Sequence, residues 1–187
     1  MIELLAVILI ILIITTLLMS NYRTGRHQLA LDRSAHKLAQ DIRRVQEMAM
    51  SSREYFACGV GFQGSFGIHL RRHNNHNHYY VLFANCDNDS QYSGADINIA
   101  REEYEPGVIF NKVQHRAGAA WVPPDPGLGP GHITIIFFPP DPERIVDCGD
   151  PLDCDVRKEH RLRLSVNGRF KCLYVNRAGL IYVKECS

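Results

Sequence analysis

The chain begins with an apolar run that is preceded by a single charge. Residues 4–19 are apolar except for two threonines, and Glu3 stands directly before them. As a helix rising 1.5 Å per residue, this run is about 25 Å long, slightly shorter than the roughly 20 residues that usually cross a bilayer. An ionisable side chain in such a segment costs at least ~2.5 kcal/mol and is by default functional. The sequence therefore predicts a membrane segment in which Glu3 has a specific partner.

A cleaved secretory signal is the alternative reading of this run. Such a signal needs a basic region before the apolar stretch and a cleavage site of small residues after it. No Lys or Arg precedes Leu4, and the run is followed by a polar stretch with Tyr22, Arg23 and Arg26, which suit a membrane interface. We therefore expect a retained anchor.

The next stretch, residues 31–53, has the spacing of one apolar helix face. Its apolar positions are Ala35, Leu38, Ala39, Ile42, Val45 and Ala49. The polar positions between them are Lys37, Gln40, Asp41, Arg43, Arg44 and Glu47. Ser34 is a possible helix cap, but Gly25 is the only strong breaker after the apolar run. One long helix is the simpler prediction, with any bend expected at Gly25.

Beyond residue 55 the sequence breaks into short β-rich runs separated by Gly, Pro, Asn and Asp, which predicts an antiparallel sheet. The candidate strands are residues 55–62, 65–71, 79–84, 108–113, 132–138, 159–166, 170–175 and 180–184. Residues 176–179 form a short loop whose Gly179 can adopt positive φ. We predict an α+β chain in three parts: residues 1–20 as the membrane or filament-core segment, 21–54 as the amphipathic half of the helix, and 55–187 as one β-rich domain.

The N-terminal motif Ile2-Glu3-Leu4-Leu5, followed by a long amphipathic helix and a strand-rich domain, resembles the type IV pilins and type II secretion pseudopilins. In that family a prepilin peptidase removes a basic leader, and Glu3 corresponds to a near-invariant glutamate. This chain starts at Met1 without the leader, the cleavage glycine or the first mature residues. The resemblance implies that the mature amino group belongs to residues preceding Met1.

The globular part looks most like the H-type minor pseudopilins and FimT-like pilins, the GspH/FimT type. The matching pieces, in order, are residues 81–89, 94–97, 106–109, 133–137 and 162–169. The resemblance implies a pilin-like fold and a minor subunit that moves from the inner membrane into a periplasmic or extracellular filament. It also implies other pilins and an assembly platform as partners. The alternative is a solitary membrane-anchored binding domain.

The resemblance also gives Glu3 a partner, namely the amino group of a neighbouring subunit. Opposite charges at ~4 Å attract far more strongly in a low-dielectric core than in water, so this pair would set the stagger between subunits. The filament-core residues implied around it are Leu4, Leu5, Val7, Ile8, Ile11 and Leu12. The alternative is that Glu3 snorkels at the interface of a simple anchor.

Six cysteines follow the anchor, and an even number in an exported domain indicates disulfides. They are Cys58, Cys86, Cys148, Cys154, Cys172 and Cys186. Fifteen connectivities are possible in principle, and the tight loop between Cys148 and Cys154 suits one bridge. We then expect Cys58 with Cys86 and Cys172 with Cys186, although the simplest hairpin register places Cys172 opposite Val183. The cysteines are not arranged in paired C-x-x-C motifs, which argues against zinc.

Two polar clusters have possible metal-ligand character. Asp87, Asp89 and Asp96 supply the oxygen ligands that calcium prefers, but their spacing is not that of a calcium loop, and Asp is an ordinary turn residue. The histidines of residues 73–78 suit a transition metal, although a polar hairpin tip is the better interpretation. We predict structural turns at both places and no bound cofactor.

No catalytic motif is present, since the sequence has neither a phosphate-binding glycine loop nor a recognisable nucleophile arrangement. We therefore expect a protein that is not an enzyme. DNA binding is the alternative function, because some FimT-like pilins bind DNA through a basic C-terminal Gly-Arg motif that residues 168–171 resemble. The candidate residues are Arg161, Arg163, Arg169 and Lys171. With a formal net charge of only +1, such binding needs a local patch.

Overall fold

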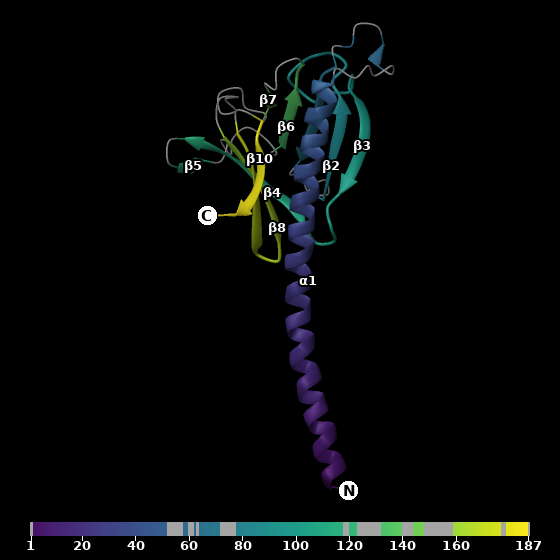
Figure 1. The fold of residues 1–187 in the computed structure, drawn as a ribbon, viewed down its shortest axis with the longest axis vertical. Helices are drawn as coiled ribbons and strands as arrows, with labels where there is room; N and C mark the ends of the chain where they lie inside the picture. Colours follow the sequence, from purple (N-terminus) through teal and green to yellow (C-terminus); the bar gives the residue numbers. More distant parts are fainter. Residues whose placement is uncertain are drawn as a thin grey trace.

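A computed structural model shows an α+β protein in which a β-rich body surrounds the C-terminal half of one long helix (Figure 1). The N-terminal half of the helix extends away from this body. The structure describes residues 2–51, 58–59, 62, 64–71, 78–117, 120–122, 132–139, 144–147, 159–176 and 179–186. Cys148, Cys154 and most of the histidine-rich stretch, residues 73–77, lie outside these ranges.

Helix α1 (Ile2–Met50) is a single helix of 49 residues. It continues through Gly25, which confirms the prediction of one long helix. Its buried stripe matches the predicted apolar positions, since Ala35, Leu38, Ala39, Ile42, Val45 and Ala49 are all buried. Ser34 lies in the middle of the helix and not at its start, so the capping role is wrong. Its Oγ instead accepts a hydrogen bond of 2.9 Å from the backbone N–H of Glu105.

The first sheet contains five antiparallel strands in the order β3-β2-β1-β6-β7. Their bounds are β1 Phe66–Arg71, β2 Tyr79–Ala84, β3 Ile97–Glu103, β6 His132–Phe137 and β7 Arg144–Asp147. Phe66, Ile68 and Leu70 alternate along β1 and are fully buried. The register brings Ala84 and Phe137 opposite Phe66 on neighbouring strands, so this face joins the core beside α1.

The second sheet also has five antiparallel strands, in the order β10-β9-β8-β4-β5. Their bounds are β4 Ile109–Ala117, β5 Ala120–Val122, β8 His160–Val166, β9 Arg169–Val175 and β10 Ile181–Glu185. Asn167 and Gly168 join β8 to β9, and both have positive φ, as an Asn-Gly hairpin turn requires. Gly179 also has positive φ (74°), which confirms the expected turn before β10.

Both sheets bury one face in a common core with α1. On β8 the residues of this face are Leu162, Leu164 and Val166, and all three belong to the core. Polar contacts also fix the helix against the sheets. Tyr80 on β2 donates a hydrogen bond of 2.5 Å to Asp41, and the Arg43 guanidinium donates one of 2.6 Å to the carbonyl of Ile181.

The strand predictions missed three strands and were wrong about one segment and one hairpin register. Strands β3, β5 and β7 were missed, and β3 carries charged residues that weaken its apolar pattern. Residues 55–62 were expected to form a strand, but of these only Cys58, Gly59 and Phe62 are described, and none lies in a strand. In the last hairpin, Cys172 lies opposite Lys184 and not Val183, because the loop closes one residue later than the simplest register assumes.

Candidate interaction surfaces

The first candidate surface is the N-terminal half of α1. All six predicted core positions, Leu4, Leu5, Val7, Ile8, Ile11 and Leu12, are exposed. Their exposed fractions range from 46% for Ile8 to 67% for Leu4. Within the described residues, the Glu3 carboxylate has neither a hydrogen bond nor an ion pair. This half of the helix is therefore an apolar surface that the rest of the chain does not cover.

The side chains of residues 17–24, in the middle of the helix, are not described. In the part of the chain that the structure does describe, we find no helix that is both long and apolar enough to cross a membrane.

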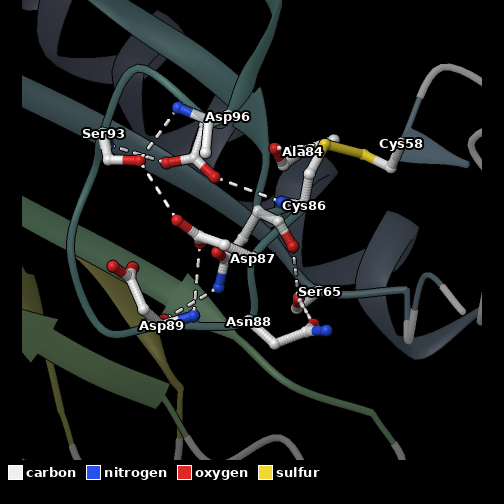
Figure 2. The surroundings of a disulfide bond; sticks show 11 residues. Cys58, Ser65, Ala84, Cys86, Asp87, Asn88, Asp89, Ser93 and Asp96 are labelled. Atoms are coloured by element: carbon white, nitrogen blue, oxygen red, sulfur yellow. Dashed lines mark hydrogen bonds between the residues drawn. A yellow bond between two sulfur atoms is a disulfide. The ribbon is translucent and has the colours of Figure 1, made fainter.

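Two of the expected disulfides are present, Cys58–Cys86 and Cys172–Cys186. The first connects the segment after α1 to the end of β2 (Figure 2). The second connects β9 to the residue that follows β10. The third expected pair, Cys148 and Cys154, falls outside the described residues.

The acidic loop after β2 is held by its own carboxylates (Figure 2). Asp96 accepts hydrogen bonds from the backbone N–H groups of Cys86 (3.1 Å) and Ser93 (2.8 Å). Asp87 accepts from the Ser93 hydroxyl and from the backbone of Asp89, at 3.1 and 3.3 Å. Burial raises the pKa of the Asp96 carboxyl, although these backbone bonds oppose the shift. The carboxylates thus stabilise a turn.

The described residues contain no group of three or more His, Cys, Asp or Glu side chains arranged to hold a metal ion. Asp87, Asp89 and Asp96 therefore do not form such a group. Of the histidine-rich run, His78 immediately precedes β2 and is exposed. Strands β1 and β2 pair as an antiparallel hairpin on either side of that run.

The four candidate DNA-binding residues lie on two faces of the second sheet. Arg161 and Arg163 alternate with the core-facing leucines of β8, so they lie on the face that points away from α1. Lys171 lies opposite Leu164 and forms an ion pair of 2.7 Å with Asp32 of the helix. Arg169 donates a hydrogen bond of 2.9 Å to Gln28, also on the helix. The four residues therefore do not form a single patch.

On the face away from α1, arginines and aromatic rings are interleaved. The Arg161 guanidinium donates two hydrogen bonds to Gln114 Oε1 and lies 4.6 Å from the centre of the Trp121 ring. Tyr174 and Tyr182 stack with their ring centres 5.0 Å apart. Sequence reasoning missed Gln114, Trp121 and both tyrosines. Tyr174 and Tyr182 lie in strands that were predicted, so the alternation of faces along those strands could have placed them on this face. Gln114 could not be placed beside Arg161, because the pairing of β4 with β8 was not predicted.

Arg163 has a different environment from Arg161. Its guanidinium lies 3.3 Å from the centre of the Phe170 ring, and its buried Nε atom has no hydrogen-bond acceptor. Desolvation, followed by repulsion from Arg161, lowers the pKa of the Arg163 guanidinium. No carboxylate in the described residues pairs with Arg163, so its charge is available to an external group.

Comparison with known proteins identifies no relative: no protein-family model, no curated protein and no solved structure matches the chain.

Proposed function

We propose that this chain is a minor structural subunit of a filament, of the type IV pilin or type II secretion pseudopilin class and the GspH/FimT type. In this proposal a prepilin peptidase processes the chain in the inner membrane. An assembly platform then moves it into a periplasmic or extracellular filament with other pilins. The protein acts by assembly and not by catalysis.

The observation that carries the proposal is the contrast within α1. One half is packed against the β-rich body, and the other half extends beyond it with exposed large apolar side chains. Burying each such side chain is worth roughly 1.5–3 kcal/mol, which strongly favours a second apolar environment. A bilayer before assembly and a bundle of neighbouring helices after it would each provide one.

Glu3 explains why the helix would leave the bilayer for a filament. A lone carboxylate in an apolar medium is costly, and the structure places no partner beside it among the described residues. In a helical bundle, the amino group of a neighbouring subunit would neutralise the carboxylate. Each added subunit would then be held in register by this pair.

The test replaces Glu3 with glutamine, which keeps the side-chain volume and removes only the charge. We expect Glu3→Gln to abolish or misalign incorporation into filaments while the β-rich body stays folded. The matched control is Glu47→Gln, an exposed position on the packed half of the helix, which should assemble normally. Incorporation is measured as the amount of the subunit in sheared filament fractions.

Normal assembly of the Glu3→Gln variant would remove the proposed role of Glu3. If the unaltered chain also fails to co-purify with any pilin-like protein, the chain is instead a solitary membrane-anchored binding domain.

DNA binding is the second candidate function, and the unpaired guanidinium of Arg163 beside Phe170 favours it. Arginines and aromatic rings on one sheet face suit phosphates and stacked bases. Binding by the full chain in detergent should weaken steeply with salt, and Arg163→Ala should reduce both affinity and salt dependence. Arg169→Ala is the comparison, because Arg169 contacts the helix instead. No binding at low salt would exclude this function.

A further inference from the structure

A groove of about 460 Å³ lies between α1 and the connection that joins β3 to β4. Residues of the helix form one wall and two residues of the connection form the other, namely Arg26, His27, Leu29, Ala30 and Arg33, and Glu105 and Pro106. All of these residues except His27 and Ala30 are exposed, so the groove is open to the surroundings of the protein.

The second wall of the groove is fixed to the helix through its backbone. The Ser34 Oγ accepts the hydrogen bond of 2.9 Å from the N–H of Glu105, and the Glu105 carbonyl accepts one of 3.0 Å from the N–H of Val108. Pro106 and Gly107 are the central residues of this turn, and Gly107 has the positive φ (85°) that a type II turn requires at its third residue. The Glu105 carboxylate therefore extends from a rigid support beside the helix.

The groove carries charges of both signs. In the part of the chain that the structure describes, neither the Arg33 guanidinium nor the His27 imidazole has a hydrogen bond or an ion pair, and the same is true of the Glu105 carboxylate. The helix wall therefore offers hydrogen-bond donors to an anion, and the opposite wall offers an acceptor to a cation.

The position of the groove along α1 indicates which molecules can reach it. The connection between β3 and β4 lies at the end of the body from which the exposed half of α1 extends (Figure 1). A hydrocarbon core of roughly 30 Å takes up about 20 helical residues, so a helix that enters it at Leu4 leaves it near Arg23. His27 is then about 6 Å farther along, in the headgroup layer. Helix side chains lean toward the N-terminus, so Arg33 leans back toward this layer.

We propose that the groove binds the headgroup of an amine-bearing phospholipid, of the phosphatidylethanolamine class, while the chain is in the membrane. The phosphate accepts hydrogen bonds from Arg33 and His27, and the ammonium group donates to the Glu105 carboxylate. The exposed apolar side chains of Leu29 and Pro106 contact the glycerol end of the lipid. This proposal rests on the proposed function, because it requires residues 4–19 to lie in a bilayer. The bound headgroup would hold the β-rich body close to the membrane surface before assembly.

Native mass spectrometry of the full-length chain in detergent measures the lipid that is bound. Phosphatidylethanolamine, phosphatidylcholine and phosphatidylglycerol with identical acyl chains are added one at a time. We expect phosphatidylethanolamine to bind about tenfold more tightly than phosphatidylcholine, whose trimethylammonium group has no N–H to donate to Glu105. It should also bind more tightly than phosphatidylglycerol, which places no cation beside Glu105. Inorganic phosphate at the same concentration should not displace the lipid, because it has neither the amine nor the acyl chains.

Two substitutions separate the roles of the two charges. Arg33→Gln should weaken the binding of all three lipids about tenfold, because each contains the phosphate. Glu105→Gln should weaken phosphatidylethanolamine and strengthen phosphatidylglycerol, because it removes both a partner for the ammonium group and a repulsion toward an anion.

The matched controls are Arg44→Gln and Glu47→Gln, at exposed helix positions that do not line the groove. Both should leave the three affinities unchanged. All four substituted side chains are exposed, so circular dichroism should show unchanged folding.

Equal binding of the three lipids by the unaltered chain would overturn the proposal, as would an unchanged lipid preference in the Glu105→Gln variant. Displacement by inorganic phosphate would also overturn it, because the groove would then be a general anion site. The filament assay separates these results from the proposed function. If Glu3→Gln blocks assembly while the lipids bind without preference, the chain is a filament subunit without a headgroup site. If the unaltered chain co-purifies with no pilin-like protein while the preference holds, the proposed function fails and the headgroup site remains.

Discussion

The two halves of α1 form one continuous helix in opposite environments. Residues 31–49 place a stripe of small and aliphatic side chains into the core, with charged residues between them. Residues 4–14 are apolar on all sides, and their side chains are exposed. A helix that is apolar all round is normally buried. The comparison teaches that the β-rich body covers only one half of the helix and leaves the apolar side chains of the other half exposed.

The two halves also differ in what maintains the helix. The packed half is held by tertiary contacts, which usually supply most of the stability of a helix. The exposed half is rich in isoleucine, a residue of moderate helix propensity, and its two threonines donate hydrogen bonds to carbonyls of the preceding turn. An apolar medium favours helix there, because it leaves the backbone no other hydrogen-bond partner.

The largest expected effect comes from trimming one isoleucine in each half. Ile42→Ala should lower the free energy of unfolding by about 2–5 kcal/mol, because Ile42 is fully buried. Ile8→Ala, the matched control, should leave the stability of the β-rich body within about 0.5 kcal/mol, because Ile8 contacts no core. Urea denaturation of the full chain in detergent measures both. Equal losses of unfolding free energy in the two variants would show that Ile8 supports the folded body as much as Ile42 does, which would contradict the comparison.

The next largest loss of stability is expected from removing the Cys58–Cys86 disulfide, which connects the segment after α1 to the end of β2. Replacing Cys58 and Cys86 together with serine should cost ~2–4 kcal/mol, because the unfolded chain regains the freedom of a long loop. Assembly through the exposed half should persist at temperatures where the domain stays folded. Thermal unfolding followed by circular dichroism measures the loss. A stability unchanged by the double replacement would contradict this role.

Alkaline pH should destabilise the packed half through Tyr80. Burial, followed by the hydrogen bond to Asp41, raises the pKa of the Tyr80 hydroxyl far above its usual range. Below pH ~10, the usual tyrosine pKa, its contribution to stability is complete. Above that pH only the unfolded state ionises, so stability falls as pH rises.

Tyr80→Phe should lose about 1.5–3 kcal/mol at neutral pH, because it removes a hydrogen bond to a charged group. It should also show a weaker decline of stability above pH ~10. Tyr182→Phe is the comparison. The bond to Glu159 raises the pKa of Tyr182 to about 12, but this side chain is on the exposed edge of the second sheet. Urea denaturation across pH distinguishes them, and identical pH profiles would contradict the assignment to Tyr80.

The smallest expected effect on stability is that of a substitution at Gly25, between the two halves of α1. Gly25→Ala should stabilise the helix by up to about 1 kcal/mol, because alanine has the higher helix propensity and no atom lies within 4 Å of the added Cβ position. Hydrogen exchange of the amides around residue 25 should slow. Faster exchange would show that alanine at this position does not stabilise the helix.

Much of the helix and part of the sheets could be predicted from the sequence. The buried stripe of α1 follows from its spacing, and the turns at residues 167–168 and 179 have the glycines that positive φ requires. Strand β3 was missed because it is an edge strand with three half-exposed or exposed charges, which interrupt the apolar alternation. The bulge in β4 at Asn111, which changes the pairing with β8, left no recognisable signal in the sequence.

The candidate surfaces were predictable to different extents. Glu3 and the apolar positions after it could be selected directly, because their pattern is local. The basic residues could not be grouped correctly, since Arg161 and Arg163 lie away from α1 while Arg169 and Lys171 contact it. Their neighbours on other strands depend on which strands pair, and that information is not local.

The sequence by itself determined the continuous helix, its buried stripe and the apolar character of its first half, because each depends on residues a few positions apart. Only the tertiary structure decided how ten described strands divide into two sheets around α1. It also decided which charged side chains pair across the chain, such as Lys37 with Glu102 and Lys171 with Asp32. Those outcomes depend on strand pairing and register, which bring together side chains that are distant in sequence.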